Sequence, residues 1–207
     1  MLDRPALSLI RPLLLALARP LVALGIGANT VTLIGFALGM GAALAIALQA
    51  GQQTLWLGLL LLLGSRLLDG LDGTVARLTV ATDRGAFLDI TLDFVFYASI
   101  PLAFALANPA ANALAAAVLL AAFMGTASSF LAFAVMAERR GLKSTEFPNK
   151  GLYYLGGLTG ATETLLCFSA MCLWPAQFAL WALGFAALCG LTLLVRLWAG
   201  WSLLRAV

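Results

Sequence analysis

The sequence predicts an all-α membrane protein, a bundle of six transmembrane helices preceded by an amphipathic helix at the membrane surface. Of its 207 residues, 63% are hydrophobic and only 10% are charged, whereas a soluble domain carries about 25% charged residues. No charged residue occurs from Pro20 to Ser65 or from Phe94 to Ala137. Each of these stretches can hold two helices of about 20 apolar residues, the length that crosses a bilayer. We therefore expect a multi-pass protein of the cell membrane.

The expected spans follow from the apolar runs and from the polar or proline-containing turns between them. They lie at about residues 31–50, 54–77, 86–107, 111–137, 151–173 and 176–199. Residues 1–25 would form the surface helix and 26–207 the transmembrane domain. The turns near 50–53, 107–112 and 173–176 carry no Lys or Arg. The positive-inside rule then puts the opposite side, with both termini and any active site there, in the cytoplasm.

The first 25 residues contain three arginines, Arg4, Arg11 and Arg19, spaced seven and eight residues apart. This spacing puts them on one face of a helix, and the leucine-rich opposite face can lie on the membrane. Each arginine is followed by a proline. We therefore expect this surface helix to be kinked or segmented.

The residues available for chemistry are restricted. The chain has no histidine, and its three cysteines all fall in the predicted spans without a CxxC pattern. The commonest zinc sites and the commonest general base are therefore excluded, and acid–base chemistry has to rely on carboxylates. We interpret the cysteines as small apolar packing residues.

Four aspartates follow the second uncharged run: Asp69, Asp72, Asp89 and Asp93. The first two are i,i+3 and the last two i,i+4, so each pair shares one face of a helix. A carboxylate at mid-bilayer costs roughly 2.5–3.5 kcal/mol, so we expect all four to face a cavity or a cation. Carboxylates without imidazole or thiolate suit Mg²⁺ or Mn²⁺, and four of them can hold two ions that clamp phosphate oxygens.

Two arginines and several glycines accompany the aspartates. Arg77, and with it Arg66, is a candidate for neutralising phosphate. Gly73 leaves space beside Asp72, and Gly85 allows close approach at the start of the third span. The spacing of these residues alone is also compatible with a cation-coupled transporter.

The aspartates belong to a longer motif. Residues 69–93 read Asp69-Gly-Leu-Asp72-Gly73-Thr-Val-Ala76-Arg77, then seven residues, then Gly85-Ala-Phe-Leu-Asp89-Ile-Thr-Leu-Asp93. This segment resembles the signature of the CDP-alcohol phosphatidyltransferase family, D-x2-D-G-x2-A-R-(x)n-G-x3-D-x3-D, at all eight defining positions. The gap of seven residues is one shorter than in many members, which shortens the turn between the two helices. Residues 28–32, Ala-Asn-Thr-Val-Thr, are similar to the family's P-N-x-x-T, with alanine in place of proline.

The resemblance implies a six-helix membrane fold, usually a homodimer, with a divalent-metal site open to the cytoplasm. By position, the four aspartates would hold the metals, and Asp93 would also be the general base. The residues implied to lie against the CMP part of a CDP-activated lipid are Asp69, Asp72, Gly73, Ala76, Arg77 and Gly85. Asn29 and Thr32 would approach the same nucleotide, although N-capping of the first span by Asn29 is an equally good account.

The implied reaction transfers a phosphatidyl group from a CDP-alcohol such as CDP-diacylglycerol to the hydroxyl of a small polar acceptor, with release of CMP. Glycerol 3-phosphate, serine, inositol and inositol phosphate remain open as the acceptor. Candidate acceptor-binding residues are Arg139, Lys143, Lys150, Glu163 and Arg196. The alternatives for them are a topology-setting basic loop, snorkelling, and a pair between the last two.

Two alternative functions stand beside this one. A cation-coupled transporter would use the carboxylates without a nucleotide, and an intramembrane aspartate-rich prenyltransferase would use Mg²⁺ on a diphosphate. CMP binding separates both from the phosphatidyltransferase, since neither needs a cytidine nucleotide. We expect a lipid bilayer and lipid substrates as partners and no nucleic acid.

Overall fold

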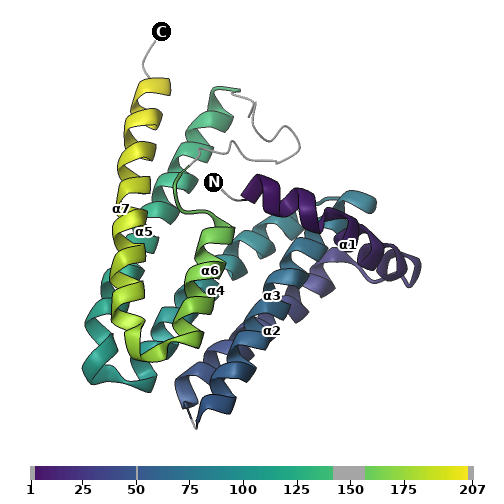
Figure 1. The fold of residues 1–207 in the computed structure, drawn as a ribbon. Coiled ribbons are helices and arrows are strands. Elements are labelled where there is room, and N and C mark those ends of the chain that lie inside the picture. The colour runs from purple at the N-terminus through teal and green to yellow at the C-terminus, as the bar shows by residue number, and fades with distance from the viewer. Residues whose placement is uncertain (1–2, 50, 142–156, 205–207) are drawn as a thin grey trace.

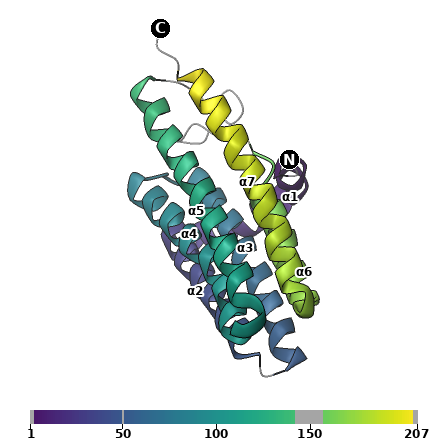
Figure 2. The same ribbon diagram turned by 90° about the vertical axis from the view of Figure 1, so that its left-hand side faces the viewer.

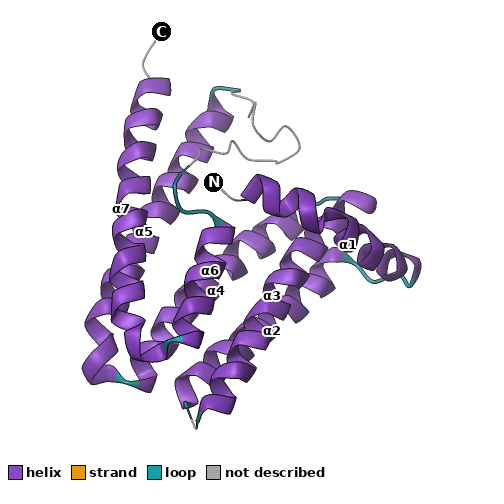
Figure 3. Ribbon diagram, in the orientation of Figure 1, coloured by secondary structure: helices purple, strands orange, loops and turns teal. Residues whose placement is uncertain are grey.

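The structure is a computed structural model that describes residues 3–49, 51–141 and 157–204. Every regular element in these ranges is a helix (Figures 1 and 3). The elements are α1 (Asp3–Ala23), α2 (Ala28–Leu48), α3 (Gln52–Leu78), α4 (Asp83–Ala107), α5 (Pro109–Arg139), α6 (Ala161–Leu173), the short 3₁₀ helix η1 (Pro175–Gln177) and α7 (Phe178–Leu203). The all-α prediction is therefore confirmed for the described residues.

Five of these helices, α2, α3, α4, α5 and the η1–α7 segment, are long and apolar enough to cross a membrane. The described helix α6 is apolar but has only 13 residues. The chain is thus a multi-pass membrane protein, while the count of six spans stays a prediction. In Figure 1 the turns α2–α3, α4–α5 and α6–α7 lie at one end of the bundle, and α1 lies at the other end.

Helix α1 lies across the ends of α2 and α3 (Figure 1). Its Leu14 and Ala18 are buried in an apolar cluster with residues of these two helices. The expected segmentation is not observed, because α1 runs as one helix from Asp3 to Ala23 with Pro12 and Pro20 inside it. Packing of this apolar face on the bundle holds the helix together despite the backbone donors that the prolines lack.

Helix α6 begins later than the predicted span of residues 151–173. Residues 157–160 are not helical, and α6 starts at Ala161 because the Glu163 carboxylate accepts a hydrogen bond from the Gly160 backbone N–H at 2.9 Å. This contact is half of a capping box, a common start of a helix. The Thr192 hydroxyl of α7 accepts hydrogen bonds from the Leu158 and Thr159 backbone N–H groups, both at 3.1 Å, and holds the segment away from helical geometry.

Helix α2 packs closely against both α3 and α4, the two helices that carry the acidic residues. A Cβ atom on Gly39 of α2 would lie only 2.5 Å from Cδ2 of Phe96 and 2.9 Å from Oγ of Ser65. Glycine at this position therefore lets a residue of α3 and a residue of α4 meet the backbone of α2. The second group of helices, in which α5 packs along α7, lies beside α4 (Figure 2).

Candidate functional site

The acidic residues lie on two consecutive helices, Asp69 and Asp72 on α3 and Asp89 and Asp93 on α4. A four-residue turn separates the two helices. Helix α4 begins after its N-cap residue Thr82. The Thr82 Oγ1 atom accepts a hydrogen bond from the Gly85 backbone N–H at 3.1 Å, which stabilises the first turn. This short antiparallel connection brings the two acidic faces together, as the motif spacing predicted.

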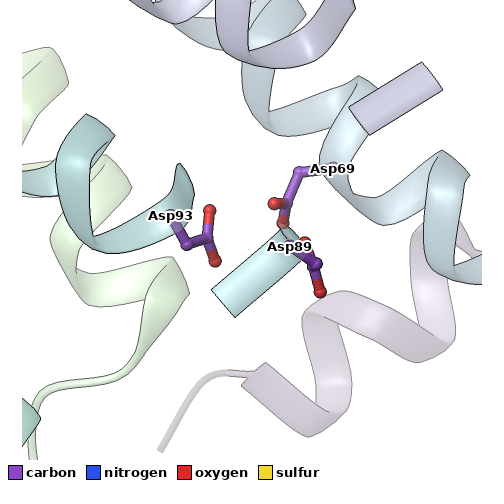
Figure 4. A group of neighbouring side chains, drawn as sticks. All are labelled: Asp69, Asp89 and Asp93. Carbon is purple, nitrogen blue, oxygen red and sulfur yellow. The ribbon is translucent and has the colours of Figure 1, made fainter. Parts of the chain in front are cut away.

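Three of the four aspartates converge. Asp69, Asp89 and Asp93 each offer one carboxylate oxygen, and these oxygens all lie within 4.8 Å of one another. Figure 4 shows Asp69 reaching from α3 towards the two aspartates of α4. Divalent cations bind oxygen at about 2.0–2.6 Å, so ligands on opposite sides of one ion are about 4–5 Å apart. The spacing of this trio therefore fits a single hard cation.

Asp72 does not belong to this close trio, but it lines the same pocket. Its side chain is almost fully buried, and its Oδ2 atom has no hydrogen-bond partner in the part of the chain that the structure describes. An unpaired buried carboxylate oxygen is costly, and a bound cation would remove that cost. The pocket is lined by Thr32, Gly35, Phe36, Ser65, Arg66, Asp69, Asp72, Asp89, Leu92 and Asp93. Its aspartates supply only oxygen ligands, which fits Mg²⁺ or Mn²⁺ rather than zinc.

Arg66 forms ion pairs with two of these acids. Its Nη1 lies 2.7 Å from Oδ1 of Asp93 and 3.3 Å from Oδ1 of Asp69. The sequence offered a signal for this contact, since Arg66 precedes Asp69 by three residues and so shares its helix face. The sequence instead indicates Arg66, together with Arg77, as a candidate for neutralising phosphate. The sequence also did not reveal the buried Ser65, which lines the pocket.

Beside the aspartates, Thr32 is the residue expected at the nucleotide that lines this pocket. Two others, Asn29 and Gly85, lie close to each other at the starts of α2 and α4. A Cβ atom on Gly85 would lie 2.9 Å from Oδ1 of Asn29, so the start of α2 meets the start of α4. Asn29 is not the N-cap of α2, because the helix begins at Ala28 and its N-cap is Gly27. The capping explanation for Asn29 was therefore wrong, and its side chain is available to face Gly85.

The other nucleotide candidates lie on the last turns of α3. Gly73 and Ala76 are half-buried, and Arg77 is exposed. The Nη2 group of Arg77 donates a hydrogen bond to Oγ1 of Thr74 at 3.0 Å. A Cβ atom on Gly73 would lie 3.4 Å from Nη1 of Arg77, so the glycine leaves room for this side chain to fold back along the helix. Arg77 is thus exposed near the end of α3, the helix that also carries Asp69 and Asp72.

The acceptor candidates are not gathered at the aspartates. Arg196 is buried and donates a hydrogen bond from Nη1 to the Thr126 carbonyl oxygen at 2.9 Å. It lines a separate, mainly apolar cavity between α5 and α7. Glu163 lies in the first turn of α6, and Arg139 is exposed in the last turn of α5. The remaining candidates, Lys143 and Lys150, lie outside the described residues.

Comparison with known proteins gives the family. The family model for CDP-alcohol phosphatidyltransferases matches residues 26–198, most of the chain and all of the acidic motif. The chain belongs to the CDP-alcohol phosphatidyltransferase family. The predicted enzyme class is thereby confirmed, as is phosphatidyl transfer from a CDP-alcohol, and neither the transporter nor the prenyltransferase alternative is needed.

This phosphatidyltransferase is similar in sequence to an inner membrane protein and in structure to a synthase of known structure. The chain is 48% identical over 207 residues to the inner membrane protein YnjF of Escherichia coli, covering 100% of this chain and 98% of that protein. It also resembles crystal structures of Mycobacterium tuberculosis phosphatidylinositol phosphate synthase. The structure with CDP-DAG bound gives a TM-score of 0.73 at 20% identity, over 94% of this chain and 98% of that one. The structure with manganese and citrate gives 0.71 at 20% identity, over 94% and 93%. At this identity the structural likeness supports the fold.

Proposed function

We propose that this phosphatidyltransferase uses CDP-diacylglycerol as donor and that Asp69, Asp72, Asp89 and Asp93 hold one or two divalent cations, Mg²⁺ or Mn²⁺. The observation that carries this proposal is the convergence of three carboxylates within 4.8 Å beside the buried, unpaired oxygen of Asp72. Four acids so placed in an apolar bundle repel one another and require cations. The manganese complex of the structurally similar synthase supports a divalent ion at such a site.

Each part of the site would have its own task. The cations, when bound, would offset negative charge on the diphosphate of the donor. Asn29, Thr32, Gly73, Ala76, Arg77 and Gly85 would bind the CMP part, which reaches the pocket from the open ends of α2, α3 and α4. Arg77 is suited to a phosphate because its guanidinium is exposed near the end of α3 and is directed along that helix by its hydrogen bond to Thr74.

Asp93 is proposed as the general base. The acceptor hydroxyl gives its proton to the Asp93 carboxylate while its oxygen attacks the phosphorus bonded to the lipid alcohol. The bond between that phosphorus and the oxygen shared with the second phosphorus breaks, and CMP leaves with the bonding electrons. The proton on Asp93 then passes to water. The products are a phosphodiester lipid and CMP.

The acceptor is proposed to be a small polar alcohol, with glycerol 3-phosphate, serine, inositol and inositol phosphate as candidates. Arg196 is the described acceptor candidate with the most distinctive environment, because it is a buried cation beside a cavity of about 550 Å³. A cation in such surroundings suits an anionic group. Glu163, in contrast, is engaged at the start of α6, which favours a structural role for it.

We further propose a homodimer with six spans per chain and α1 lying in the cytoplasmic interface. The exposed side chains of Arg11 and Arg19, and the burial of Leu14 and Ala18 on the bundle, support a position at the surface of the bilayer. Both termini and the acidic pocket would then face the cytoplasm. The absence of Lys and Arg from the three turns at the other end of the bundle supports this orientation.

The experiment is CMP release by the purified protein in detergent–lipid micelles containing CDP-diacylglycerol and Mg²⁺ or Mn²⁺, with each acceptor supplied separately. We expect release with one acceptor, and its loss on addition of a chelator. Asp93→Asn should lower the rate by at least about 100-fold, the contribution typical of a general base.

Asp83→Asn is the matched control. It makes the same chemical change on the same helix, at an exposed position that does not line the pocket. We expect it to keep the wild-type rate. Equal rates for Asp93→Asn and Asp83→Asn would refute the role of Asp93. No release with any acceptor, together with no metal-dependent binding of CDP-diacylglycerol, would refute the proposed donor.

A further inference from the structure

Arg66 connects the two helices of the site through one nitrogen atom. Its Nη1 contacts Oδ1 of Asp69, on its own helix α3, and Oδ1 of Asp93 on α4. The contact with Asp93 is a hydrogen bond of 2.7 Å, short as expected for two charged partners. The candidate base and a candidate metal ligand are therefore held by the same cation.

The rest of the Arg66 side chain is fixed by its surroundings. The guanidinium carbon lies 3.9 Å above the ring centroid of Phe96 and 5.4 Å from that of Tyr97. Nη2 lies 3.3 Å from Oγ of Ser65. Only 11% of the side chain is exposed. An arginine stacked on an aromatic ring and hydrogen-bonded along its edge has little freedom to move towards a ligand.

The position of Arg66 along α3 distinguishes it from the other arginine of the motif. It precedes Asp69 by about one helical turn, on the side of the buried ring of Phe96, whereas Arg77 follows the acids at the exposed end of α3. Arg66 lines the pocket, whereas Arg77 is not among its lining residues. A donor that approached along α3 from its exposed end would pass Asp72 and Asp69 before it reached the Arg66 guanidinium.

We propose that Arg66 is a positioning residue, which aligns Asp69 and Asp93 across the two helices and limits how tightly the pocket binds divalent cations. This inference rests on the proposed function, in which these acids hold the cations. The alignment follows from the shared Nη1 contact, which fixes Oδ1 of Asp93 relative to Oδ1 of Asp69. The effect on affinity follows from charge, because a fixed cation beside the carboxylates repels a second cation in surroundings that screen poorly.

The test compares wild type, Arg66→Met and Arg66→Lys in two assays in micelles. One is titration of the chelator-treated protein with Mn²⁺, followed by the electron paramagnetic resonance signal of free Mn²⁺. We expect Arg66→Met, which removes the charge but keeps a similar length, to bind Mn²⁺ about tenfold more tightly or better. Arg66→Lys keeps the charge, so its affinity should stay within about threefold of wild type.

The second assay is CMP release. A lysine cannot contact two carboxylates and stack on Phe96 as a planar guanidinium does. Both variants should therefore lose kcat by about tenfold or more, while KM for CDP-diacylglycerol changes by less than about threefold. If Arg66→Met fails to fold, Arg66→Lys still tests the positioning role through this split between kcat and KM.

The outcomes separate this proposal from its competitors. A rise in KM with kcat retained would mean that Arg66 binds the donor phosphate, and the proposal would be wrong. Unchanged or weaker Mn²⁺ binding by Arg66→Met would overturn the charge effect. Arg84→Met, an exposed arginine on α4, is the control and should leave the Mn²⁺ titration unchanged. If wild type itself releases no CMP, the proposed function fails, but the Mn²⁺ titration still decides the role of Arg66.

Discussion

At the scale of single residues, the acids of the pocket differ in how their charge is compensated. Asp69 and Asp93 share the guanidinium of Arg66. Asp72 is more deeply buried, and one of its oxygens has no partner among the described residues. Because it is buried with an unpaired oxygen, the Asp72 carboxylate destabilises the metal-free protein more than the other acids do. A bound cation should therefore stabilise this carboxylate the most.

This difference predicts an unusual effect of Asp72→Asn on stability. The substitution replaces a buried charged carboxylate by a neutral amide of similar size and shape. In the presence of chelator, the melting temperature of the variant should therefore be no lower than that of wild type. Addition of Mn²⁺ should raise the melting temperature of wild type, since ligand binding stabilises the folded state. It should raise that of the variant by less, because the variant keeps only the trio of Asp69, Asp89 and Asp93. Thermal unfolding in micelles, followed by tryptophan fluorescence, measures both. A destabilised metal-free variant would contradict this account.

At the scale of helices, the site depends on how closely α2 approaches α3 and α4. Gly39 leaves the space that Phe96 and Ser65 occupy. The Phe96 ring stacks against the Arg66 guanidinium, and Oγ of Ser65 accepts a hydrogen bond from its Nη2. Gly35, one turn earlier on α2, faces Leu68 and the Ser65 backbone in the same way. The glycine face of α2 thus allows the close helix packing on which the positions of the acids on α3 and α4 depend.

Gly39→Ala should therefore destabilise the protein and impair the site. A methyl group 2.5 Å from Cδ2 of Phe96 forces that ring to move, and overpacking of this kind costs about 1–3 kcal/mol. We expect a lower melting temperature and a loss of kcat, because the ring supports the guanidinium of Arg66. Gly41→Ala is the control on the same helix, since its methyl group would lie 3.5 Å from Leu61, an ordinary contact. Equal melting temperatures for the two variants would show that the close packing at Gly39 is unimportant.

At the scale of the whole molecule, the bundle has two unlike ends (Figure 1). One end carries the three turns without basic residues, and the other carries α1 and the end of α5 with Arg139. The acidic pocket lies on the halves of α3 and α4 nearer the second end. A soluble acceptor would therefore have to arrive from the side that the basic residues face.

The proposed orientation predicts which positions a membrane-impermeant maleimide reaches in intact cells. Single cysteines would be introduced in a variant whose three native cysteines are replaced by alanine. A cysteine at Gln52, the first residue of α3, should be labelled from outside. A cysteine at Arg139 should be labelled only after the membrane is permeabilised, because we place that end in the cytoplasm. The reverse pattern would invert the topology and put the acidic pocket outside the cell.

Much of this molecule followed from sequence patterns that depend on neighbours along the chain. Hydropathy predicted the helices because each span has to satisfy its own backbone hydrogen bonds in lipid. Helical periodicity put Asp69 with Asp72 and Asp89 with Asp93, and the short connection brought three of these acids together. The match to the signature then predicted the family that the comparison established.

The tertiary structure alone decided what depends on contacts between helices that are distant in sequence. Hydropathy extended the fifth span back to residue 151, but hydrogen bonds to Thr192 of α7 keep residues 158 and 159 out of a helix. The sequence also grouped Arg196 with the acceptor residues of the site, whereas packing of α7 against α5 places it in a separate cavity. Arg66 pairs with Asp93, 27 residues later in the chain, because the packing of the helices brings the Asp93 carboxylate next to its guanidinium. Periodicity reports which face of a helix a residue occupies, and only the packing of helices determines what that face meets.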